Sequence, residues 1–74
     1  MMGGADMTFT EALEVVRRGG RMYRTGWGNG NSGTYGALFE GFLSLYKEAD
    51  DEWNTWLVSE ADIFARDWHV VQAA

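Results

Sequence analysis

The chain has 74 residues, no cysteine and one histidine, so it is long enough for one domain and holds neither disulfides nor a cysteine-based zinc site. Its formal net charge of −5 argues against a general nucleic-acid-binding protein, because such proteins neutralise phosphates with lysine and arginine. No apolar run reaches the roughly 18 residues of a membrane span, and residues 1–7 lack the basic and apolar regions of a signal peptide. We therefore expect a cytoplasmic protein with no membrane partner. A small core without disulfides or metal also favours self-association.

The first predicted element is a helix over residues 9–18. Thr8 and Glu11 have the spacing of a capping box, in which each residue satisfies a backbone N–H of the other. Apolar residues then recur at helical spacing, and the glycine pair 19–20 ends the helix.

Alternating side chains and turn residues predict the elements that follow. Strands are expected at 21–25, 35–39, 42–47, 52–58 and 67–72; a short helix, opened by a capping signature at 59–62 and ending near residue 65, precedes the last strand; and a flexible glycine loop occupies 28–33. This order predicts an α+β fold, in which the N-terminal helix packs on a mostly antiparallel sheet of about five short strands. We assign residues 1–7 to a flexible tail and 8–72 to a single ligand-binding domain.

The sequence contains little that resembles catalytic machinery. The glycine loop lacks both the Lys-Ser/Thr ending of a phosphate-binding Walker loop and the helix that a dinucleotide fingerprint requires. The serines have only His69 as a possible base, and no serine motif points to it. We therefore expect a protein that is not an enzyme, with no catalytic residues, metal ligands or cofactor.

The basic residues are concentrated in one part of the chain. Four of the six lie within eight positions just before Trp27: Arg17, Arg18, Arg21 and Arg24. Arginine suits bidentate phosphate contacts, so this run beside a tryptophan would form a phosphate clamp next to a stacking surface. Alternatively, the first two arginines compensate the helix dipole and the other two lie on an exposed strand face. The spacing does not distinguish these two interpretations.

Three segments, which follow one another along the chain at 8–20, 24–29 and 56–68, carry a resemblance to a known family. They read TFTEALEVVRRGG, RTGWGN and WLVSEADIFARDW. Together they resemble a family of small phage and prophage proteins that includes the second type of Thoeris anti-defense protein. The resemblance covers about residues 7–72. The chain departs from the family pattern in its glycine loop and at Thr55, where relatives often carry proline.

The resemblance implies a phage anti-defense sponge. Such a protein binds and sequesters a cyclic ADP-ribose-type immune signal, and in some relatives cyclic oligonucleotides, without degrading it, and so blocks activation of the bacterial effector. The family also implies a homotetramer with pockets between protomers, in the host cytoplasm if phage-encoded. The alternative is an acidic protein-binding inhibitor of a host defence enzyme. That class would spread carboxylates along an exposed face, whereas here they lie near turns and helix starts.

Five residues are the candidate ligand-binding residues: Trp27, Arg24, Asn29, Trp56 and Asp62. We expect Trp27 to stack on a base or ribose face and Arg24 to contact phosphate. Asp62 would accept hydrogen bonds from ribose hydroxyls or an adenine amine, although helix capping alone also explains it. Trp68 is expected in the core or in a subunit interface.

Overall fold

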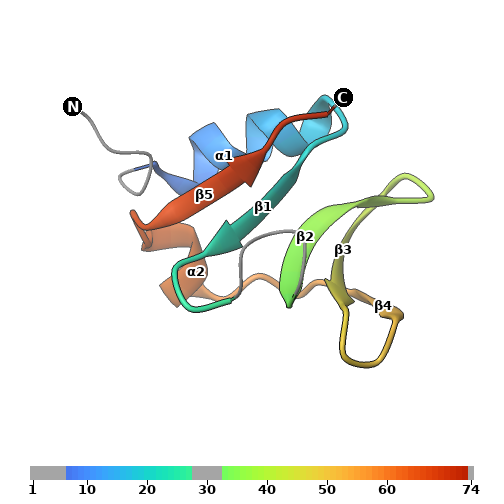
Figure 1. Cartoon of the computed structure of the whole chain (residues 1–74). Coiled ribbons are helices and arrows are strands. Elements are labelled where there is room, and N and C mark those ends of the chain that lie inside the picture. Colours follow the sequence, from blue (N-terminus) through green and yellow to red (C-terminus); the bar gives the residue numbers. More distant parts are fainter. Residues whose placement is uncertain (1–6, 28–32, 74) are drawn as a thin grey trace.

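The computed structural model describes residues 7–27 and 33–73, which form two helices and five strands (Figure 1). In chain order these are α1 (Phe9–Arg17), β1 (Arg21–Arg24), β2 (Thr34–Phe39), β3 (Phe42–Lys47), β4 (Glu52–Thr55), α2 (Glu60–Phe64) and β5 (Trp68–Val71). The predicted α+β class, with a helix first and a short helix before the last strand, is confirmed. Residues 1–6 of the predicted tail and 28–32 of the predicted glycine loop lie outside the described residues.

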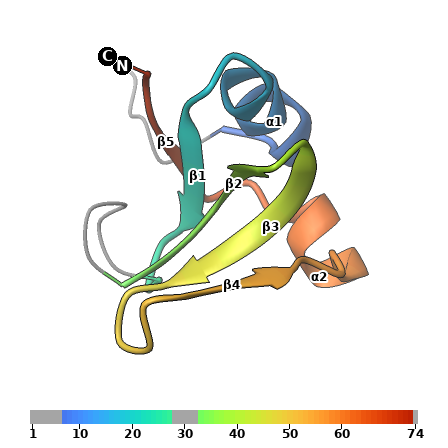
Figure 2. The ribbon, with the colours of Figure 1, turned by 90° about the vertical axis from the view of Figure 1, so that its right-hand side faces the viewer.

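All five strands form one antiparallel sheet in the order β4-β3-β2-β1-β5. The last strand of the chain returns to pair with the first, and its register places Trp68 opposite Arg24. Helix α1 packs against β1, β2 and β5 (Figures 1 and 2). The β3–β4 turn lies at the far end of the sheet from α1. No helix in the described part of the chain is long and apolar enough to cross a membrane.

The start of α1 and the β2–β3 turn form where neighbouring residues in the sequence predict them. The N–H of Thr8 donates to the Glu11 carboxylate at 2.9 Å, and the N–H of Glu11 donates to the Thr8 hydroxyl at 3.2 Å, which confirms the capping box. Glu40 and Gly41 both have positive φ, at 54° and 86°, as a two-residue hairpin turn with the right-handed strand twist requires.

The predicted strand at 52–58 is wrong in its length, since β4 ends at Thr55. The next residue, Trp56, is 7% exposed and enters the core beneath β2. Space for its ring exists because residue 36 is glycine: a Cβ there would lie 2.5 Å from Cζ3 of Trp56. The chain therefore leaves the sheet three residues earlier than the β-rich composition of 52–58 predicts. The other predicted element ends agree with the structure to within one residue.

The core lies between α1 and the β1–β5 side of the sheet. Its buried members are Ala12, Val16, Met22, Trp56 and Trp68. Trp68 is expected from the sequence in the core or in a subunit interface. It is fully buried within the single chain, so it belongs to the core.

A second aromatic group covers the opposite face of the sheet. Trp53 on β4 stacks on Phe39 at 4.7 Å between ring centroids and also contacts Tyr35 and Tyr46. These side chains share one face because paired residues in an antiparallel sheet point the same way. The chain thus divides its aromatic residues between two faces, and only one of them carries α1.

Candidate functional site

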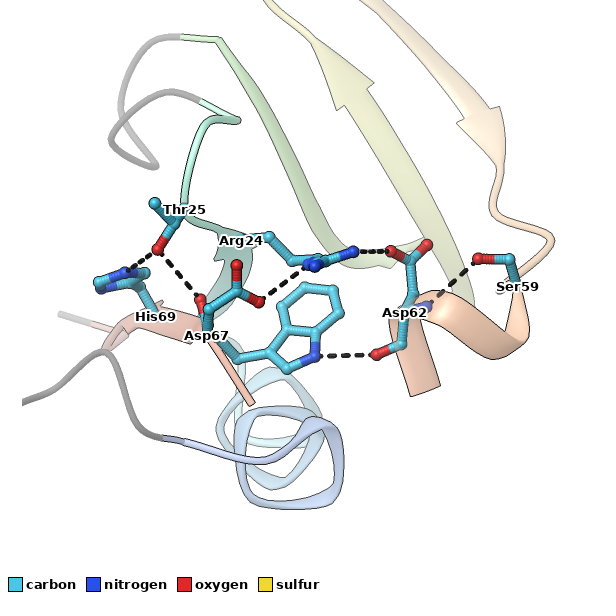
Figure 3. Close-up of polar contacts among 7 residues, drawn as sticks. Arg24, Thr25, Ser59, Asp62, Asp67 and His69 are labelled. Carbon is cyan, nitrogen blue, oxygen red and sulfur yellow. Dashed lines mark hydrogen bonds and ion pairs between the residues drawn. The ribbon is translucent and has the colours of Figure 1, made fainter. Parts of the chain in front are cut away.

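The end of β1 meets α2 and the α2–β5 connection through one arginine. Arg24, the last residue of β1, lies between Asp62 and Asp67 (Figure 3). Its Nε donates to Asp67 Oδ1 at 2.9 Å, and its Nη1 donates to Asp62 Oδ1 at 3.1 Å. The side chains of Arg24 and Asp62 are only 29% and 17% exposed, so this ion pair is partly shielded from solvent. One guanidinium therefore joins three segments of the chain.

The charge balance of this group is acidic. The pKa of Arg24 is raised most by the hydrogen bond from its side chain to Asp67 and second by the one to Asp62, so the guanidinium stays charged. One positive and two negative side chains give the group a net charge of −1. The two carboxylates thus more than neutralise the arginine that the sequence assigns to a phosphate.

Trp27 lies just beyond Arg24 and is held at both its backbone and its ring. Its N–H donates to the carbonyl of Arg24 at 3.0 Å, and its own carbonyl accepts from the N–H of Thr34 at 2.9 Å. The half-buried ring meets Trp68 and Trp56 edge to face, at 5.4 Å and 5.9 Å between centroids. This geometry fixes the orientation of the ring while part of it stays accessible.

Trp68 connects this ring to α2. Its indole N–H donates to the backbone carbonyl of Asp62 at 3.0 Å, which satisfies the buried polar atom. The N–H of Asp62 in turn donates to the hydroxyl of Ser59, the N-cap of α2, at 3.3 Å. Ser59 therefore caps α2, and helix capping does not explain the carboxylate of Asp62, which faces Arg24.

The structure brings four of the five predicted site residues into one neighbourhood. Arg24 bonds to Asp62, and Trp27 contacts Trp56. Asn29 lies outside the described residues. Trp56 is largely buried within a single chain, so only a small part of its surface can meet a ligand. Ligand contact at each of the five stays a prediction.

The remaining arginines of the predicted cluster are engaged elsewhere. Arg17 and Arg18, at the end of α1, form ion pairs with Glu14 at 2.8 Å and 3.2 Å. Arg21 lies over the ring of Tyr35, 4.4 Å from its centroid. Neither interpretation of the cluster holds in full: Arg17 and Arg18 lie at the end of α1 as the second expects, but Arg24 is partly buried between two carboxylates and does not lie on an exposed strand face.

Sequence reasoning missed the part that Asp67 plays. This residue accepts from the Arg24 side chain, and its backbone carbonyl accepts from the N–H of Thr25 at 3.2 Å. The Thr25 hydroxyl also lies 3.0 Å from Nε2 of His69 (Figure 3). Two sequence signals point to Asp67: it follows the short helix without being its cap, and it lies in the family-like segment 56–68.

The described residues contain no group of three or more histidine, cysteine, aspartate or glutamate side chains arranged to hold a metal ion.

Comparison with known proteins agrees with the resemblance seen in the sequence. The profile of the Thoeris anti-defense 2-like domain matches residues 7–71. The chain is similar to Thoeris anti-defense 2 of Bacillus phage SP01, with 30% identity over 84 aligned positions, which cover 88% of this chain and 94% of the phage protein. The matched region includes every helix and strand of the structure. The chain therefore belongs to the Thoeris anti-defense 2-like family.

Proposed function

We propose that this protein is an anti-defense sponge, which binds a cyclic ADP-ribose-type nucleotide signal and sequesters it without degrading it. Cyclic oligonucleotides are a second ligand class for the same role. Removal of the signal would leave the bacterial effector inactive, in the cytoplasm where the signal acts. Membership of an anti-defense family, whose phage relative carries that activity in its name, supports the general role.

The observation that carries the proposal is the ring of Trp27. It is half-buried, and two other tryptophans hold it edge to face. A ring fixed before binding loses little rotational freedom when a base stacks on it, so more of the stacking energy appears as affinity. A stacked base typically contributes about 1–3 kcal/mol in nucleic-acid complexes.

Asp62 provides a hydrogen-bond acceptor in the same neighbourhood. A carboxylate has about four acceptor positions, and Arg24 occupies one of those on Asp62. The carboxylate can therefore also accept from ribose hydroxyls or an adenine amine. Trp68 contacts both the ring of Trp27 and the backbone of Asp62, so the same buried side chain holds the proposed stacking ring and the proposed acceptor.

Sequestration requires no nucleophile, general base or metal ion, and we propose that the protein is not an enzyme. A retention experiment tests this directly. The protein is incubated with the cyclic ADP-ribose-type signal, freed of unbound ligand and denatured by heat, and the released nucleotide is analysed by mass spectrometry. We expect intact signal, in an amount that scales with protein. Altered signal would indicate an enzyme, and release of no nucleotide would favour the protein-binding inhibitor.

We further propose that the protein acts as a homo-oligomer, with a tetramer as the expected state. Several large apolar side chains are exposed on the single chain: Phe42, Leu57 and Phe64 are 72%, 86% and 77% exposed. Large exposed apolar side chains mark an interface where they gather into a patch, and in a homo-oligomer they would be covered by a second copy of the chain. Light scattering coupled to size exclusion should give a mass near four times the 8.3 kDa of one chain. A mass of 8.3 kDa across the micromolar range would contradict self-association.

A further inference from the structure

We infer that Arg24 and Asp67 are positioning residues for the stacking ring of Trp27, and that Arg24 is not the phosphate ligand of the site. The inference rests on the proposed nucleotide binding and assigns roles within it. It replaces the phosphate contact that the sequence predicts for Arg24.

The first argument is the occupancy of the guanidinium. Arg24 directs Nε to Asp67 and Nη1 to Asp62, and these partners lie 43 and 38 positions away in the chain. The contact with Asp67, at 2.9 Å, has the length of a charge-assisted hydrogen bond, and the contact with Asp62 is slightly longer at 3.1 Å. Turning the guanidinium toward a phosphate would break at least one of them and leave a partly buried carboxylate without its counter-ion.

The second argument is the sign of the local charge. Two carboxylates and one guanidinium leave this group at −1. A phosphate placed against Arg24 would also approach Asp62 and Asp67, whose negative charges repel it. The group is therefore poorly suited to an anion, and better suited to fixing the chain segments that it joins.

The third argument concerns what these contacts hold in place. Asp67 binds the end of β1 twice, through its carboxylate to Arg24 and through its carbonyl to the N–H of Thr25. Trp27 follows two residues later, and its N–H returns to the carbonyl of Arg24. The orientation of the ring thus depends on a turn that Asp67 and Arg24 anchor from two sides.

The two roles of Arg24 predict opposite results for Asp67→Asn. If Arg24 were the phosphate ligand, removal of a competing negative charge would free the guanidinium and tighten the binding of an anionic nucleotide. If Arg24 and Asp67 position Trp27, loss of the charge-assisted hydrogen bond weakens binding by about tenfold or more. The dissociation constant for the cyclic ADP-ribose-type signal, measured by calorimetry, distinguishes the two.

Two further variants complete the test. Glu14→Gln changes the net charge by the same amount on an exposed part of α1, where the carboxylate pairs with Arg17 and Arg18, and should leave the affinity unchanged. Arg24→Lys keeps the positive charge but cannot bridge both carboxylates in the planar fork, so we expect it to weaken binding as Asp67→Asn does. Because a phosphate-binding Arg24 would also be weakened by this change, the NMR signal of Trp27 in the free Arg24→Lys protein provides the comparison if Asp67→Asn does not fold. Tighter binding in Asp67→Asn, or full affinity in Arg24→Lys, overturns the inference.

A readout without ligand separates this inference from the proposed function. The indole N–H signals of the four tryptophans can be followed by NMR in the free protein. Asp67→Asn should shift or broaden the signal of Trp27, while Glu14→Gln should leave it in place. If wild-type protein retains no nucleotide, the proposed function fails. An unchanged Trp27 signal in Asp67→Asn overturns the positioning role by itself.

Discussion

Replacement of Trp68 by alanine is expected to cause the largest loss of stability among the proposed variants. Its side chain is fully buried and donates its indole N–H to the carbonyl of Asp62. Large-to-small changes at buried aromatic positions cost about 3–5 kcal/mol. A domain of 74 residues has roughly 4–11 kcal/mol of total stability. The change therefore removes a large share of the free energy of unfolding.

Thermal and urea unfolding followed by far-ultraviolet circular dichroism measure this effect. Trp53→Ala is the matched control, since Trp53 is only half-buried and packs on the sheet face opposite the core. We expect its effect on the unfolding midpoint to be clearly smaller. A midpoint for Trp68→Ala within a few degrees of wild type would show that the core does not depend on this ring.

Replacement of Trp27 by alanine is expected to weaken nucleotide binding by roughly 5- to 150-fold, which corresponds to the loss of about one stacked base, 1–3 kcal/mol. The effect should fall mainly on dissociation, because the encounter rate does not depend on this uncharged ring. Equilibrium titration and a chase with unlabelled nucleotide measure the affinity and the dissociation rate.

Two variants control for loss of structure at Trp27. Trp27→Phe keeps a stacking ring and should lose less affinity than Trp27→Ala. Trp53→Ala removes a tryptophan that has no part in the proposed site, and should bind as wild type does. Full affinity in a folded Trp27→Ala variant would remove this ring from the site while leaving sequestration itself open to other residues.

The sequence predicts this fold well where the determinants are local. The capping box of Thr8 and Glu11 and the hairpin turn at Glu40 and Gly41 involve neighbours in the chain, so residue types alone indicate them. The length of β4 depends instead on a contact between Trp56 and residue 36 on another strand. Strand propensity carries no information on such a contact, and the prediction therefore extended the strand too far.

Sequence reasoning names several residues of the candidate site but not the contacts among them. Arg24, Trp27 and Asp62 follow from residue types and from the family resemblance. The ion pairs of Arg24 follow from the pairing of β1 with β5, which brings together residues about 40 positions apart. A run of arginines in the sequence resembles an anion site. In the fold, the carboxylates of Asp62 and Asp67 lie beside Arg24 and offset its charge. The charge of the site thus depends on the pairing of β1 with β5, which composition does not reveal.

The contact between Gly36 and Trp56 has a consequence for how members of this family can diverge. The tryptophan that reaches under β2 belongs to the core and also supports the ring of Trp27. If the ring of Trp27 binds the nucleotide as proposed, ligand preference and foldability are coupled at these positions, because a substitution that reshapes the aromatic wall also opens a cavity or creates a steric clash in the core. Adaptation to a new signal is easier at residues that border the wall without filling the core. Sequence differences between relatives with different ligands should therefore concentrate around the tryptophans, with the tryptophans themselves retained.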